Sequence, residues 1–156
     1  MKLLFAAVLF LLINACNMHE EKNSSVQPSV QEKNKELIRT GFDNVVNKQN
    51  YSLIDSLFAD SIYDHGAFEG QEQGFAGFKK AVIDFLSTFS HIEATIEEII
   101  AERDIVATRE HWTVTRKSDN KVLSGVVMHW FRIDNGKVTD EWSKGWEWME
   151  LGSSGQ

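Results

Sequence analysis

The stretch Asp64-His65-Gly66 places an acid and an imidazole side by side, just before a glycine. A carboxylate and a histidine can act as general base and general acid near neutral pH, because the ordinary pKa of histidine lies close to that range. A structural explanation is equally concrete, since either side chain can bond backbone groups of the turn that Gly66 permits. Proton transfer and turn formation are therefore both open for Asp64 and His65.

A second set of acid–base side chains lies in the C-terminal half of the chain: Glu110, His129 and Glu141. Two nearby carboxylates favour the charged form of a histidine, and one carboxylate of such a pair can have a raised pKa. This combination suits moving a proton to or from a carbon next to a carbonyl group. Two alternatives stay open: a structural hydrogen-bonded network, which also perturbs pKa values, or a reversed strand face that puts the three residues in solvent.

Secondary-structure periodicity separates the chain into a helical part and a strand part. Three stretches have apolar residues at helical spacing, over residues 36–46, 52–58 and 74–89. After them the period changes to two, which predicts strands over residues 91–100, 104–116, 121–133 and 137–149. Helices followed by antiparallel strands predict an α+β domain in which the helices cover one face of a strongly bent sheet.

The turn between the second and third predicted strands sets which residues face each other. If Asp119-Asn120 is a two-residue hairpin loop, Glu110 lies opposite His129. The same register gives two further pairs on that face, Trp112 with Val127 and Thr108 with Phe131.

The next turn is a choice between two loops with opposite consequences. A two-residue Asn135-Gly136 loop pairs His129 with Trp142, whereas a three-residue loop with a left-handed glycine pairs His129 with Glu141. A slip of one residue exchanges the two faces of the strand. We predict the three-residue loop, which brings Glu110, His129 and Glu141 together on the concave face. It leaves three tryptophans on the opposite face, Trp142, Trp146 and Trp148.

Three segments of the sequence are similar to successive blocks of a known family. The blocks are "YSLIDSLFADSIYDHGAFEGQEQGFAGFKKAV", "REHWTVTR" and "HWFRIDNGKVTDEWS". They resemble SnoaL-like polyketide cyclases of the nuclear transport factor 2-like superfamily, over about residues 35–150, and the family's "DGK" turn agrees with the three-residue loop. The resemblance implies a cone-shaped α+β fold, with three N-terminal helices on a strongly curved, mainly antiparallel sheet. A small, largely apolar molecule usually binds between them, although the scaffold carries many different functions.

The resemblance also implies roles for residues of this chain. In a cyclase-like site, His129 and Glu141 exchange protons with a small, partly apolar carbonyl compound, while Glu110 orients the histidine. Asp64 and His65 stand at the mouth of the pocket. The expected pocket wall consists of Trp112, Phe131, Val127, Phe42 and Ser143. Family members work without metal or organic cofactor, and the sequence has no phosphate-binding glycine loop, nucleophile elbow or metal-ligand spacing, so neither is expected here.

Two of these wall positions differ from patterns in related proteins. Phe42 stands about where ketosteroid isomerases carry a tyrosine, which argues against that chemistry. Ser143 stands where many cyclase relatives carry an acid, so that Glu141 would have to replace it in a catalytic protein. A non-catalytic ligand-binding protein and a protein-interaction module are therefore alternatives to an enzyme.

Large aromatic side chains predict how the domain assembles. The predicted outer sheet face carries Trp130, Trp142, Trp146 and Trp148. Such a face is too apolar to be left comfortably in water, and aromatic residues are enriched in interface cores. The sequence therefore predicts a homodimer through this sheet face.

The N-terminus has the pattern of a lipoprotein signal. A lysine, an apolar run too short to span a bilayer and small residues come before Cys16, which gives a signal peptide over residues 1–15 and a lipidation site at Cys16. Cys16 has no second cysteine to pair with. An ordinary secretory peptide is the alternative. Polar residues then predict a flexible tether over 16–34, followed by the domain at 35–150 and a disordered tail at 151–156.

Length and charge limit the remaining possibilities. The chain has 156 residues, enough for one globular domain after the N-terminal segment, and a formal net charge of −7. An acidic domain is a poor binder of polyanions, so no nucleic-acid partner is expected. Attachment to the membrane of the cell envelope is expected through the N-terminal lipid and not through a basic face.

Overall fold

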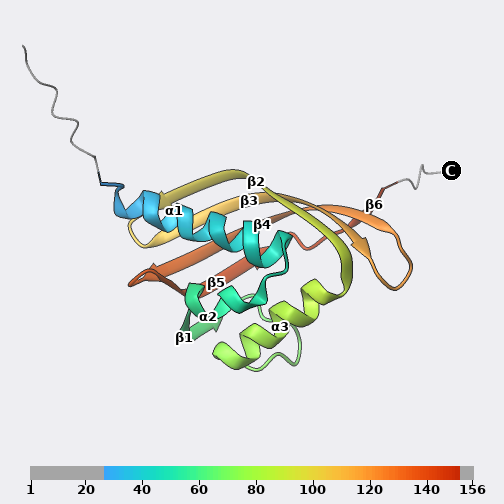
Figure 1. Cartoon of the computed structure of the whole chain (residues 1–156), viewed down its shortest axis with the longest axis horizontal. Helices are drawn as coiled ribbons and strands as arrows, with labels where there is room; N and C mark the ends of the chain where they lie inside the picture. The colour runs from blue at the N-terminus through green and yellow to red at the C-terminus, as the bar shows by residue number, and fades with distance from the viewer. Residues whose placement is uncertain (1–26, 152–156) are drawn as a thin grey trace, which may run out of the picture.

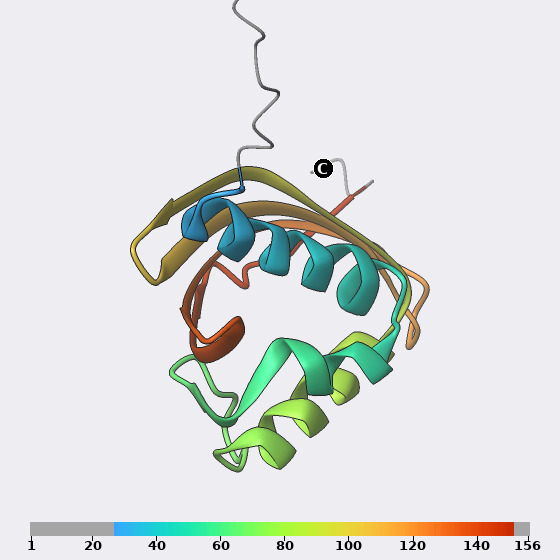
Figure 2. The same ribbon diagram turned by 60° about the vertical axis from the view of Figure 1, so that its left-hand side comes forward.

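The computed structural model describes residues 27–151, which form a strongly curved sheet with helices on its concave side (Figures 1 and 2). The helical segments are α1 (Val30–Thr40), the π-helical η1 (Gly41–Asn47), the 3-10 turn η2 (Tyr51–Leu53), α2 (Ile54–Leu57) and α3 (Phe75–Ser87). The strands are β1 (Phe58–Asp64), β2 (Phe89–Glu102), β3 (Ile105–Arg116), β4 (Val122–Asp134), β5 (Lys137–Lys144) and β6 (Met149–Glu150). The predicted α+β class, with helices on one face of a bent sheet, is confirmed.

The sheet is mixed because it contains one parallel strand, β1, which the sequence did not predict. Its order is β1-β5-β4-β3-β2, and β6 pairs with a further part of β4. All neighbours are antiparallel except β1, which runs parallel to β5. This parallel pairing sets Asp64 beside Glu141 and thereby joins the two parts of the sequence that carry acid–base residues.

Helix α1 begins earlier than the predicted domain boundary. Ser29 caps the helix by accepting a hydrogen bond from the Glu32 backbone N–H at 3.2 Å. Val30 is then the first helical residue, so the part of the predicted 16–34 tether from Val30 onward is helix. Ile38 and Phe42, four residues apart, are buried on the side that faces the sheet, and the π-helical turns of η1 continue the same face.

The turn between β3 and β4 differs from the predicted two-residue loop. The Asn120 N–H donates to the Arg116 carbonyl and the Arg116 N–H donates to the Lys121 carbonyl, which leaves four residues in the loop. Asp119 stabilises this longer loop by accepting from Arg116 Nε at 3.0 Å and from the Lys121 N–H at 3.2 Å.

The longer loop shifts the register but preserves the faces. The predicted pairs were wrong by two residues: the structure pairs Glu110 with Val127 and Thr108 with His129. It also pairs Trp112 with Gly125 and Val106 with Phe131. An even shift keeps every side chain on its face of the strand, so Glu110 and His129 still share the concave side.

The turn between β4 and β5 is the two-residue loop that we did not predict. Asn135 and Gly136 both have positive φ, 49° and 75°, and Asp134 pairs with Lys137 across them. This loop alone would turn Glu141 to the outer face.

A bulge in β5 reverses that consequence. Ile133 pairs with Val138, whereas Arg132 pairs with Asp140, so Thr139 is an extra residue in the strand. Glu141 therefore returns to the concave face, opposite Phe131. The predicted loop was wrong, and the predicted side of Glu141 was right because the bulge compensates for it.

The predicted tryptophan face is wrong for Trp146 and Trp148, because the last predicted strand breaks at Gly145. Gly145 has a φ of 98°, and a Cβ there would lie 2.6 Å from the Val126 carbonyl oxygen, so glycine suits this close approach. Beyond it, Trp146 and Trp148 turn inward and contact Trp112, with ring centroids 5.6 and 6.5 Å apart. Trp130 and Trp142 remain paired across β4 and β5 on the opposite face, and the homodimer stays a prediction.

The N-terminal predictions fall outside the part of the chain that the structure describes. The signal peptide, Cys16 and most of the tether lie before residue 27, and the tail from residue 152 onward is likewise outside. Within residues 27–151, none of the helices combines the length and the apolar character that a membrane span needs.

Candidate functional site

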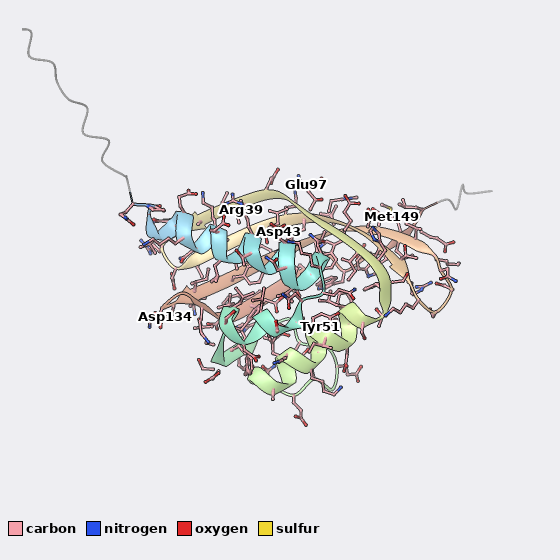
Figure 3. The ribbon with its side chains drawn as sticks, in the orientation of Figure 1. Arg39, Asp43, Tyr51, Glu97, Asp134 and Met149 are labelled. Atoms are coloured by element: carbon pink, nitrogen blue, oxygen red, sulfur yellow. The ribbon has the colours of Figure 1, made fainter. Side chains whose placement is uncertain are left out.

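The helices and the concave sheet face enclose a cavity of about 130 Å³. Helical residues such as Ile38, Phe42 and Phe85 line one side, and Trp112, His129 and Phe131 from the sheet line the other. The space is large enough for a small molecule or several waters. Arg39, Asp43 and Glu97 belong to a separate polar groove between α1, η1 and β2 (Figure 3).

His129 lies at the sheet side of the cavity between two glutamates. Its Nδ1 is 2.9 Å from Glu110 Oε2, and its Nε2 is 3.4 Å from Glu141 Oε1. Glu110 is fully buried, whereas the side chains of His129 and Glu141 are 7% and 12% exposed. Glu110 does not line the cavity and therefore acts on a ligand only through His129. Glu141 and the second nitrogen of His129 are the groups that a ligand can reach.

Rings pack around the imidazole and fix its orientation. The Phe131 ring stacks on His129 at 5.4 Å, and Phe42 and Trp146 contact it edge-on at 5.9 and 5.5 Å. These contacts exclude water from most of the imidazole. A charge-bearing ring in such surroundings needs the carboxylates on both sides of it.

Asp64 is the third carboxyl group at the cavity. It is 9% exposed, and it accepts hydrogen bonds from the Gly66 N–H at 2.8 Å and from Gln71 Nε2 at 2.7 Å. Gln73 holds the backbone of Asp64 by donating to its carbonyl at 3.1 Å. The carboxylate is thus positioned by neutral donors, and within the described chain it forms no ion pair.

The pKa values of both Glu141 and His129 are raised above their ordinary values. Burial raises the pKa of Glu141 to about 7, with the charge of His129 opposing the shift and those of Asp64 and Glu110 adding to it. Burial acts to lower the pKa of His129, but the hydrogen bond to Glu110 and the charges of Glu141, Glu110 and Asp64 outweigh it, so that the pKa is raised. A carboxyl group that titrates near pH 7 suits general acid–base catalysis.

The structure brings together most of the predicted site and separates two members from it. Seven predicted residues line the cavity: Asp64, His129, Glu141, Trp112, Phe131, Phe42 and Ser143. Val127 is fully buried but does not line it. His65 does not line it either: it lies on the opposite face, 3.0 Å from Asp140 Oδ1 and stacked on Trp142.

Trp146 and Gln71 are members of the site that the sequence did not predict. Trp146 reaches the cavity only because Gly145 ends the strand, and its Nε1 donates to Ser143 Oγ at 3.0 Å. Gln71 comes from the loop between β1 and α3, where no periodicity predicts direction. A glycine within an alternating pattern was the one available signal for Trp146, since an isolated glycine in a strand often marks a break or bulge.

Comparison with known proteins identifies the family. The family model of the SnoaL-like polyketide cyclases matches residues 36–145. The chain belongs to the SnoaL-like polyketide cyclase family. The match begins within α1 and ends at Gly145, so it includes all the cavity-lining acids. None of the curated proteins matches the chain.

Solved structures of similar shape support the same fold. TsrD from Streptomyces laurentii has a TM-score of 0.66 and 15% identity, over 76% of this chain and 91% of that one. A proposed polyketide cyclase from Acidithiobacillus ferrooxidans has a TM-score of 0.65 and 24% identity, over 77% and 92%. An LEH-like epoxide hydrolase from M. tuberculosis has a TM-score of 0.62 and 14% identity, over 74% and 84%. At identities of 24% or less, these TM-scores show a shared fold, with helices on the concave side of a curved sheet.

Proposed function

We propose that this SnoaL-like protein is a cofactor-independent acid–base catalyst that acts on a small, partly apolar carbonyl compound. The single observation that supports this most strongly is the position of Glu141 and His129 Nε2, 3.4 Å apart at the wall of a largely apolar cavity. The raised pKa of Glu141 adds to it. Family membership makes a cyclase or isomerase type of reaction the first choice.

The proposed reaction uses the two reachable groups in complementary roles. The Glu141 carboxylate takes a proton from the carbon next to the carbonyl group, while the His129 imidazolium donates a proton to the carbonyl oxygen. The product is an enol with both protons accounted for. Return of a proton to a different carbon gives an isomer, and attack of the enol carbon on a second carbonyl group closes a ring.

Glu110 and Asp64 have supporting roles in this proposal. Glu110 binds Nδ1 of His129 and thereby fixes the ring and favours its charged form, so it is a positioning residue. Asp64 adds negative charge beside Glu141 and raises the pKa of that carboxyl group.

Hydrogen exchange into simple ketones tests the proton-transfer step directly. The protein is incubated with cyclohexanone or 1-tetralone in D₂O, and loss of the α-proton signal is followed by NMR. We expect catalysed exchange that rises with pH through about 7, as Glu141 ionises, and falls when His129 loses its proton.

Variants assign the exchange to named residues. His129→Phe and Glu141→Gln are expected to lower the rate by a factor of about 100 or more, the usual contribution of a positioned acid or base. His91→Phe, at an exposed histidine of β2, is the matched control and keeps the wild-type rate. Exchange that persists in both site variants would contradict the proposal.

The same cavity also suits a protein that only sequesters its ligand, because its lining is predominantly apolar. In that case a ketone quenches the fluorescence of Trp112 and Trp146 on binding without any exchange of its α-proton. The two readouts therefore separate a binding protein from a catalyst.

The proposal places the protein in the cell envelope, anchored through a lipid on Cys16. It is supported by the signal pattern of residues 1–15. In a bacterial host, the full chain is expected in the membrane fraction, and Cys16→Ser is expected to move it to the soluble fraction. An unchanged distribution would contradict the anchor.

We further propose a homodimer through the outer sheet face. Val126 and Met128 are 43% and 40% exposed there, beside the paired Trp130 and Trp142. Sedimentation of residues 27–151 at micromolar concentration is expected to give twice the monomer mass, and a monomeric mass would contradict the dimer.

A further inference from the structure

The cavity has a mainly apolar lining, but its few polar groups carry more negative than positive charge. Its polar wall consists mainly of the carboxyl groups of Asp64 and Glu141 and the imidazole of His129, with Glu110 directly behind. Within residues 27–151, the lining contains no lysine and no arginine. One imidazolium cannot neutralise two or three carboxylates, so the cavity keeps an excess of negative charge.

Asp64 interacts with the charge of His129 only at longer range and, within the described chain, forms no direct ion pair. Its hydrogen bonds come from a backbone N–H and an amide. A carboxylate that is nine-tenths buried beside a cavity is stabilised when a cation enters that cavity. The opposite arrangement, an anionic ligand group beside Asp64 and Glu141, is repelled at close range in a medium of low dielectric constant.

Aromatic rings supply an apolar surface for the rest of the ligand. Phe85, Trp112 and Trp146 contact one another with ring centroids 5.1–6.4 Å apart, and all three line the cavity. The indole Nε1 of Trp112 is buried and has no hydrogen-bond partner within the described chain.

We propose that the ligand carries a protonated amine, with its ammonium group beside Asp64 and an apolar body among the rings. This inference rests on the proposed function, because it names the class of carbonyl compound that the same cavity takes: an amino-carbonyl compound. It excludes carboxylated and phosphorylated substrates from the cavity.

Three probes that share a 2-phenylethyl body and differ in charge test the inference. They are 2-phenylethylamine, 2-phenylethanol and 3-phenylpropanoate, titrated at pH 8 while tryptophan fluorescence is recorded. We expect the amine to bind at least about tenfold more tightly than the alcohol, with the carboxylate weakest. A carboxylate that binds as tightly as the amine overturns the inference, and so does a failure of all three probes to bind.

Substitution of Asp64 tests whether its carboxylate causes the preference for the amine over the alcohol. Asp64→Asn is expected to bring the amine and the alcohol to within about threefold of each other, while affinity for the alcohol is retained and reports that the cavity is intact. Asp60→Asn is the matched control, because Asp60 is exposed on the same strand, β1. An amine preference that survives in Asp64→Asn overturns the inference.

A second variant keeps the test valid if Asp64→Asn fails to fold. Glu141→Gln removes the neighbouring charge, so a smaller amine preference supports the inference and an unchanged one overturns it. The ketone exchange experiment is independent of ligand charge. Exchange without amine preference overturns only this inference, and amine preference without exchange removes the catalytic role but leaves the cation site.

Discussion

Two histidine–carboxylate pairs lie on opposite faces of the same part of the sheet. His129 is 2.9 Å from Glu110 on the concave face, and His65 is 3.0 Å from Asp140 on the other. The first pair is closed off by rings at the cavity, whereas the His65 and Asp140 side chains are 33% and 20% exposed. Each pair joins an imidazole to a carboxylate at nearly the same distance, and the two pairs differ clearly in their access to water.

At the end of β1 and in β5, neighbouring residues face opposite sides of the sheet. Asp64 and Glu141 are cross-strand partners that face the cavity, while the adjacent His65 and Asp140 face away. Burial raises the pKa of Glu141 to about 7. Burial also acts to raise the pKa of Asp140, but hydrogen bonds from His65 and Thr139 outweigh it and lower the pKa. Two adjacent carboxyl groups are thus shifted in opposite directions, and only the inner one is suited to proton transfer at pH 7.

The largest expected contrast between the pairs is in stability. Glu110→Ala is expected to lower the free energy of unfolding by about 3–5 kcal/mol, because it leaves the buried imidazole without its partner. Asp140→Ala is expected to cost about 1 kcal/mol or less, since the outer pair remains partly solvated. Urea unfolding of both variants measures the contrast, and equal losses would show that burial does not distinguish the two pairs.

A contrast of intermediate size is expected in the pH dependence of stability. The folded pKa of Glu141 is about 7 and its ordinary value is 4.5, so its contribution is fully present below pH 4.5 and is lost as pH rises through 7. The pKa of His129 is also raised above its ordinary value of 6.5. The stability that His129 contributes is therefore fully present below pH 6.5 and is lost as the pH rises through the folded pKa.

Glu141→Gln removes the ionisation that costs stability at high pH. Relative to wild type, we expect the variant to gain about 1–3 kcal/mol of unfolding free energy between pH 5 and pH 8. Urea midpoints at the two pH values measure it. A variant that follows the wild-type pH profile would contradict the raised pKa.

The smallest effect is expected on the outer face. His65→Phe keeps a ring that can stack on Trp142 but removes the ion pair with Asp140. We expect a change of about 1 kcal/mol or less in unfolding free energy and an unchanged rate of ketone exchange. A loss of exchange as large as that expected for His129→Phe would mean that His65 takes part in the chemistry.

The sequence predicted the fold class because the two hydrophobic periods are long and clear. The stripe on α3 and the alternation in β3 and β4 each extend over more than ten residues. Strand β1 was missed because it is short and follows directly on α2. The start of α1 was missed because its first turns are polar, and the Ser29 cap is a weaker signal than an apolar stripe.

The site was predictable in its residue types but not in its register. Glu110, His129 and Glu141 were expected on one face, and they share it, although both turns differ from the prediction. The first error was an even shift, which preserves faces, and the second was reversed by the bulge at Thr139. The four-residue loop is held by contacts of Asp119 with Arg116 and Lys121, which the two-residue prediction did not consider, and the bulge at Thr139 has no strong local signature.

His65 and Trp146 show where alternation fails as a guide. Asp64 is the last residue of β1 and faces the cavity, whereas His65 begins the following turn and contacts Trp142 and Asp140 on the other face. Trp146 lies inward because Gly145 interrupts the alternation that was extended through residue 149. The position of a residue along its strand is therefore a better guide to the direction of its side chain than the short motif to which it belongs.

A carboxyl NMR titration tests the central claim most directly. With ¹³C-labelled protein, the side-chain carboxyl signals of Glu141 and Asp140 are followed from pH 2 to pH 9. The account predicts a pKa of about 7 for Glu141 and a pKa below the ordinary 3.8 for Asp140. A Glu141 that titrates near 4.5 would contradict it, because the cavity would then hold no carboxyl group able to exchange protons at neutral pH.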